Sequence, residues 1–151
     1  MSNLPNLSEV LAYQNLQVIE RFKANHPLEA HRAEYLFTEM LRYLWLCEKH
    51  DCDLAQNPND PGLQFIPVMH EEMRSIDTMW HEFILITRDY SQFCSQYFGH
   101  FIHHEPNMRE TLNLSTEQFI ESLQLFLNYI YDVLGEEVLK NWFQEHLSLA
   151  A

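Results

Sequence analysis

The sequence predicts an all-α protein, folded as a single-domain bundle of about six helices over residues 1–151. The chain has only three glycines, and residues that favour helices, such as Leu, Glu, Gln and Met, are common. Hydrophobic residues make up 46% of the chain, which excludes a disordered protein. A length of 151 residues suits one domain and allows a core without disulfide or metal supports.

The chain is strongly acidic, with 22 Asp and Glu against nine Lys and Arg and a formal net charge of −13. Such a surface repels the phosphates of nucleic acids and the headgroups of anionic membranes, so neither is expected as a partner. The charge favours a solvated surface, or an unknown protein partner of basic character. No apolar run is long enough to span a bilayer.

Three cysteines, Cys47, Cys52 and Cys94, are too few and too irregularly spaced for a disulfide framework. We therefore expect reduced thiols and a cytoplasmic protein. The N-terminal residues show no basic stretch followed by an apolar run, so no signal peptide is expected. A C-terminal export signal of unrecognised type stays open.

The first two helices are predicted from their caps. Ser8 is placed to cap a helix that runs to about Asn25. Pro27 suits the first turn of a second helix, which we expect to reach about His50. Residues 51–66 contain the motif Asn-Pro-Asn-Asp-Pro-Gly and are predicted to form the one long loop.

A third helix is predicted over Pro67–Ile86 and a fourth from about Thr87 to the residue before Gly99. Gly99 suits a left-handed C-terminal cap. Residues 100–113 are expected to be irregular.

The last two helices have the clearest signals. The sequence Ser115-Thr-Glu-Gln118 matches a capping box and predicts a fifth helix that continues to Leu134. Gly135 ends it, and residues 136–147 form the predicted sixth helix.

Two adjacent stripes run along the predicted third helix when it is placed on a wheel of about 100° per residue. The apolar stripe marks the core, and the polar stripe beside it lies at the margin of the core. The members of the apolar stripe are Met69, Met73, Ile76, Trp80 and Phe83, and those of the polar stripe are His70, Arg74, Asp77 and His81.

Asp77 and His81 are i, i+4 neighbours, so the carboxylate can orient the imidazole. If His103 or His104 returns to this helix, the set Asp77, His81, His103 and His104 suits zinc or another divalent transition metal. The expected pocket would be lined by His70, Arg74, Trp80, Tyr90 and Cys94. The alternative is a buried hydrogen-bonded network of the same groups with no metal.

Known catalytic motifs are absent from this stretch. The sequence His81-Glu82-Phe-Ile-Leu85 lacks the second histidine of the zinc-protease motif. The chain also contains no glycine-rich phosphate loop, no serine nucleophile elbow and no basic aromatic patch.

The pattern Asp77-x-x-Trp80-His81-x-x-Ile-Leu, followed by Tyr90, Cys94, Phe-Gly99 and His103-His104-x-Pro, resembles the glycine-rich domain-containing protein-like family, in a short bacterial-type form. The similarity covers about residues 67–107. It singles out six residues without assigning them a reaction, namely Asp77, Trp80, His81, Gly99, His103 and His104. This chain lacks the glycine-rich segment for which the family is named.

Three functional hypotheses follow. The first is a small accessory or interaction protein whose His/Asp pocket binds a divalent metal. The second is a metal-dependent enzyme of the hydrolase class, and the third is a structural homodimer without a ligand site. The substrate, the partner, the oligomeric state and the identity of a metal are not encoded in any motif of the sequence.

Overall fold

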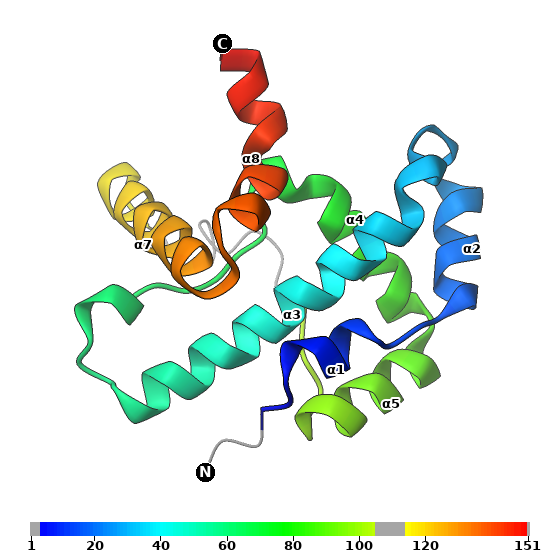
Figure 1. The fold of residues 1–151 in the computed structure, drawn as a ribbon, viewed down its shortest axis with the longest axis horizontal. Coiled ribbons are helices and arrows are strands. Elements are labelled where there is room, and N and C mark those ends of the chain that lie inside the picture. Colours follow the sequence, from blue (N-terminus) through cyan, green and yellow to red (C-terminus); the bar gives the residue numbers. More distant parts are fainter. Residues whose placement is uncertain (1–3, 105–113, 151) are drawn as a thin grey trace. The chain divides into compact units, whose positions relative to one another are not determined.

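The computed structural model describes residues 4–104 and 114–150, with side chains up to residue 143. This part of the chain contains α-helices and short 3₁₀ helices and no strand, as Figure 1 shows. The predicted all-α class is confirmed. None of its helices is both long and apolar enough to cross a lipid bilayer.

The chain divides into two compact units, each built from two separate stretches. Unit 1 comprises Met1–Lys49 and Arg74–Ile102, and unit 2 comprises His50–Met73 and His103–Ala151. Whether both units fold as one cooperative domain stays a prediction.

The prediction of one helix from Ser8 to about Asn25 is wrong. This stretch forms two helices, α1 (Leu7–Leu11) and α2 (Leu16–Asn25). The break is fixed by Asn15, which has extended backbone dihedrals and accepts a hydrogen bond from the Val18 backbone N–H through its side chain. An asparagine in this position caps a new helix better than it continues an old one. The cap of α1 is Asn6, not Ser8.

The second predicted helix begins at Pro27 as expected, but its first residues form a 3₁₀ helix instead of an α-helix. Pro27 opens a 3₁₀ helix, η1 (Pro27–Arg32), which leads into α3 (Ala33–Gln56). The helix passes the predicted end at His50 because residues 51–56 contain no glycine or proline to stop it. The predicted loop is correspondingly shorter, and it contains a single 3₁₀ turn, η2 (Pro61–Leu63).

The third helix begins later than predicted. Residues after Pro67 remain non-helical up to a 3₁₀ turn, η3 (Glu71–Met73), which continues as α4 (Arg74–Leu85). Helix α5 (Thr87–Phe98) follows with a break at the expected place. Gly99 caps it with φ of 76°, as the sequence predicts.

Unit 2 contains α7 (Thr116–Leu134) and α8 (Glu136–Ala150), which pack against each other. The capping box is confirmed, since Ser115 and Gln118 exchange both hydrogen bonds. Gly135 adopts φ of 98° and ends α7, as expected. Residues 100–104 are non-helical, and the rest of the predicted irregular segment, up to residue 113, lies outside the described residues.

A chain of hydrogen bonds joins α4, α5 and the segment after Gly99 inside unit 1. The Trp80 indole Nε1 donates to the Tyr90 hydroxyl oxygen at 3.0 Å, and that hydroxyl donates to the Ile102 carbonyl oxygen at 2.6 Å. Trp80 and Tyr90 are both buried, as their position on the apolar side of their helices requires. The Tyr90 hydroxyl therefore satisfies two buried polar groups that are distant in sequence.

Removing this hydroxyl tests its weight in the fold. In Tyr90→Phe, the Trp80 N–H and the Ile102 carbonyl lose their shared partner, so the free energy of unfolding should fall by about 1–3 kcal/mol. Denaturant melts measure the change. Tyr131→Phe is the matched control, because Tyr131 is 54% exposed and the same substitution there should shift stability by less than about 0.5 kcal/mol. Equal effects of the two substitutions would contradict the role given to Tyr90.

Candidate functional site

The residues of the predicted metal site are spread over both units. Asp77 is half-buried and His81 is exposed on α4 in unit 1, whereas His103 and His104 belong to unit 2. No group of three or more His, Cys, Asp or Glu side chains that could hold a metal ion is found within residues 4–104 and 114–143. Convergence of Asp77, His81 and one of His103 or His104 stays a prediction.

Three of the predicted pocket residues belong to the core of unit 1. Trp80, Tyr90 and Cys94 are all buried. Burial raises the pKa of the Tyr90 hydroxyl, although the hydrogen bond from Trp80 lowers it in part. Burial likewise raises the pKa of the Cys94 thiol, which keeps it protonated and a weak metal ligand or nucleophile at neutral pH. Arg74 is exposed at the start of α4.

The cysteines are not joined to one another by disulfides, as the sequence leads us to expect. All three lie within the described part of the chain.

Sequence reasoning missed a buried carboxylate, Glu82, on α4. Its side chain is only 6% exposed and accepts from three groups on α2 or just after it. The Arg21 Nε lies 2.7 Å from one carboxylate oxygen, Asn25 Nδ2 lies 3.2 Å from it, and His26 Nε2 lies 3.3 Å from the other. A buried charge needs such pairing, so this cluster fastens α2 to α4. One sequence signal could have indicated a polar contact here. Arg21 and Asn25 are one helical turn apart, so they lie on the same face of their helix.

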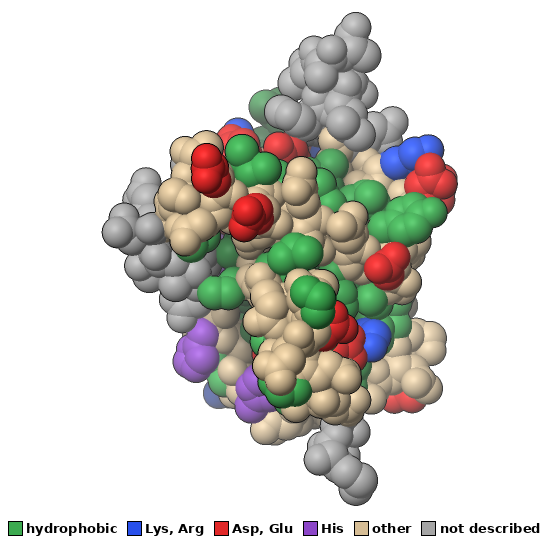
Figure 2. Space-filling model, turned by 90° about the vertical axis from the view of Figure 1, so that its left-hand side faces the viewer, with side chains coloured by type: hydrophobic (Ala, Val, Ile, Leu, Met, Phe, Trp, Pro, Cys, Tyr) green, Lys and Arg blue, Asp and Glu red, His purple; other side chains and the backbone are tan. Residues whose placement is uncertain are grey.

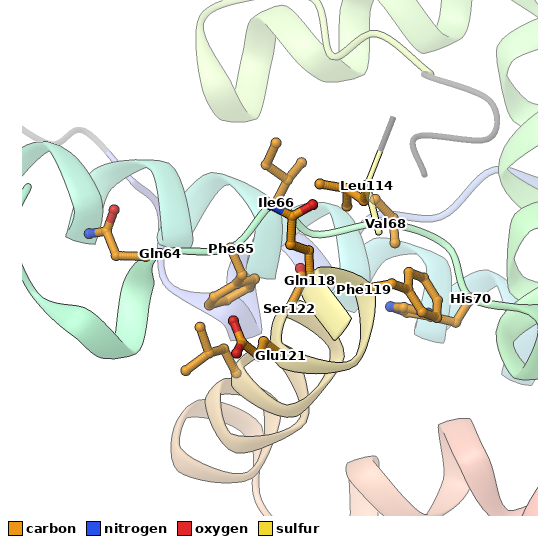
Figure 3. A pocket seen from close by; sticks show the side chains of 11 residues that line it. Gln64, Phe65, Ile66, Val68, His70, Leu114, Gln118, Phe119, Glu121 and Ser122 are labelled. Atoms are coloured by element: carbon orange, nitrogen blue, oxygen red, sulfur yellow. The ribbon is translucent and has the colours of Figure 1, made fainter. Parts of the chain in front are cut away.

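A concavity of unit 2 lies between residues 64–70 and the first half of α7 (Figure 3). Its volume is about 290 Å³. Apolar side chains dominate its walls, with a few polar groups among them. The lining residues are Gln64, Phe65, Ile66, Val68, His70, Leu114, Gln118, Phe119, Glu121, Ser122 and Leu125.

His70 is the only residue of the predicted pocket set that lines this cavity. It is 9% exposed, and its ring packs among Phe119, Phe126 and Phe143 at centroid distances of 5.5 to 6.2 Å. Burial lowers the pKa of His70, and the nearby carboxylate of Glu72 raises it to a smaller extent. Neither ring nitrogen is hydrogen-bonded to another described residue, so a neutral imidazole can offer one donor and one acceptor to a ligand.

The negative charge of the protein is concentrated in the unit that contains this cavity. Unit 2 holds 13 of the 22 acidic residues and only two basic ones, Arg109 and Lys140, which gives a formal charge of −11. Unit 1 holds nine acidic and seven basic residues and has a formal charge of −2. On the face drawn in Figure 2, acidic side chains lie among hydrophobic ones.

Comparisons with known proteins give one result. A model of the family described as UCP032817-like matches residues 64–131, which is somewhat less than half of the chain. The matched region begins at the first wall of the cavity and ends near the end of α7, so it includes every lining residue. No curated protein matches the chain, and no solved structure does.

The lowered pKa of His70 predicts a pH dependence of stability. The unfolded chain takes up a proton near the ordinary histidine pKa of about 6.5, whereas folded His70 resists protonation to a lower pH. The folded state should therefore lose stability as the pH falls below about 6.5. Thermal melts between pH 7 and pH 5 should show a smaller decrease in Tm for His70→Gln than for the wild type.

The same substitution at His31, an exposed histidine of η1, is the control and should leave the pH dependence unchanged. If His70→Gln and the wild type lose stability in parallel, the neutral state of His70 does not contribute to folding.

Proposed function

We propose that this chain is a small accessory protein that acts by binding, and that its binding site is the cavity between residues 64–70 and α7. The observation that carries the proposal is His70, a nine-tenths buried imidazole in the cavity wall without a hydrogen-bond partner among the described residues. Its ring packs among aromatic side chains, but its nitrogens are not fully enclosed, so a ligand in the cavity can hydrogen-bond to them.

The chemistry of the cavity suits binding better than bond cleavage. His70 is the group best placed to move a proton at neutral pH, but no carboxylate or hydroxyl among the described residues is hydrogen-bonded to it. Such a partner would orient the ring for general base catalysis. A wall that combines apolar side chains with hydrogen-bonding groups, among them His70, Gln118 and Ser122, instead favours recognition of a group that is partly apolar and partly polar.

We also propose that the chain is a short relative of the glycine-rich domain-containing protein-like family. This assignment rests on the sequence pattern over about residues 67–107, which lies within the region matched by the UCP032817-like model. We also propose a cytoplasmic location, in line with the reduced thiols.

Titration with small aromatic probes tests the binding site. Phenol and indole carry an apolar ring and a hydrogen-bond donor that can reach a neutral imidazole nitrogen. We expect them to shift the side-chain ¹⁵N resonances of His70 in NMR spectra, with the backbone signals of α7 residues 118–125 following. Ser122→Trp should abolish these shifts by filling the cavity.

Gln124→Trp is the matched control, because Gln124 is exposed on the same helix and does not line the cavity. It should leave the probe shifts intact. The proposal fails if neither probe perturbs His70, or if both tryptophan variants behave alike.

The metal hypothesis is tested separately. If Asp77, His81 and one of His103 or His104 bind zinc or a similar divalent ion, protein purified without chelator should contain about one metal ion per chain. His81→Ala should lower that content, whereas His31→Ala should not. A wild-type protein free of metal after growth in zinc-supplemented medium would remove the metal site and the metal-dependent enzyme with it.

A further inference from the structure

Residues 66–70, which form part of the cavity wall, have the side-chain pattern of a strand. Figure 3 shows this segment running as a non-helical chain past the first half of α7. From Ile66 on, every second residue lines the cavity, namely Ile66, Val68 and His70, whereas Pro67 and Met69 do not; Gln64 and Phe65 both line it where the segment begins. Alternation of this kind places one face of an extended segment against the cavity.

The backbone of this segment is not paired within the described structure. No hydrogen bond to another described residue involves the backbone N–H or C=O groups of residues 66–69. Pro67 has no N–H to offer, but Ile66, Val68 and Met69 each do. Unpaired groups along an extended segment are a template on which a further strand can form.

The cavity has the size of a site for one side chain. Its volume of about 290 Å³ lies at the lower limit of small-molecule pockets. A strand paired to residues 66–69 would present its alternate side chains on the same face as Ile66 and Val68, and so toward the cavity. One apolar or aromatic anchor would then meet Phe65, Phe119 and the ring of His70.

Charge determines which peptide would fit. Glu121 lines the cavity, is exposed, and forms no ion pair with any described residue. It belongs to the unit whose formal charge is −11. A basic segment is attracted to this surface, whereas a second copy would bring two surfaces of the same sign together.

We propose that the cavity binds an extended, basic segment of a partner protein, which pairs with the backbone of residues 66–69 and inserts one aromatic or large apolar side chain beside His70. This inference rests on the proposed function and specifies the occupant of the same site. Backbone pairing would provide affinity, the cavity would select the anchor, and lysine or arginine residues beside the anchor would face Glu121.

The experiment uses the full chain and a fluorescent peptide, Lys-Lys-Thr-Phe-Thr-Lys-Lys, in an anisotropy titration. Replacing its phenylalanine by serine should weaken binding at least about tenfold, because the serine side chain cannot fill the cavity with apolar surface. Methylating the backbone nitrogens of the two threonines should also weaken binding about tenfold or more by blocking strand pairing. Replacing the four lysines by glutamates should abolish it.

Two pairs of protein variants separate site from surface effects. Ser122→Trp should abolish peptide binding, and Gln124→Trp should preserve it. Glu121→Gln should weaken binding about two- to fivefold at low salt, and Asp132→Asn, an exposed neutralisation farther along α7, should have less effect. The effect of Glu121→Gln should decrease as salt is added, because exposed charges are screened.

The outcomes distinguish this inference from the proposed function. Phenol and indole binding at His70 without peptide binding overturns the peptide inference and leaves the binding site intact. Peptide binding that is indifferent to the anchor or to Ser122→Trp also overturns the inference, since it would then reflect charge alone. Concentration-dependent dimerisation of the free chain that Ser122→Trp abolishes would show a second copy as the occupant and overturn it as well.

Discussion

The fold of unit 1 depends on the placement of one hydroxyl group. The Tyr90 oxygen accepts from Trp80 and donates to the Ile102 carbonyl, so it links α4, α5 and the segment that follows Gly99. The Trp80 N–H and the Ile102 carbonyl both lie in the buried interior, so the loss of this shared partner would be costly. The left-handed turn at Gly99 makes this arrangement possible, because it lets the chain reverse and bring Ile102 back to the core.

Glu82 is a buried charged group, and it too needs hydrogen-bonding partners inside the protein. Its carboxylate is buried next to Arg21, Asn25 and His26, which all come from the end of α2. From the sequence, His81 is expected to be a residue of the binding site at the margin of the core. In the structure His81 is exposed, and the neighbouring acid Glu82 is buried. The wheel gives the direction of each side chain on α4, but it does not show what α2 brings to that side of the helix.

Unit 2 has a different character. It holds nearly all of the net negative charge and a cavity whose walls are mostly apolar, with the neutral His70 ring among aromatic side chains. In the binding mode that we propose, this charge attracts a basic segment and the cavity supplies the selective contact. The segment around Pro67 forms one wall of this cavity and is not helical. The backbone groups of residues 66–69 are therefore not paired within the described structure.

The sequence by itself determined the helical class, the capping box at Ser115, the ends at Gly99 and Gly135, and the burial of Trp80, because these depend on a few neighbouring residues. It did not determine the break at Asn15, where a local cap competes with continued helix. The extension of α3 to Gln56 was missed, although residues 51–56 contain no glycine or proline that would stop a helix. Only the tertiary structure placed His70 in a cavity wall and Glu82 inside an ionic cluster. Those positions depend on α7 and α2, which approach from distant parts of the chain, and helical periodicity describes only the helix on which a residue lies.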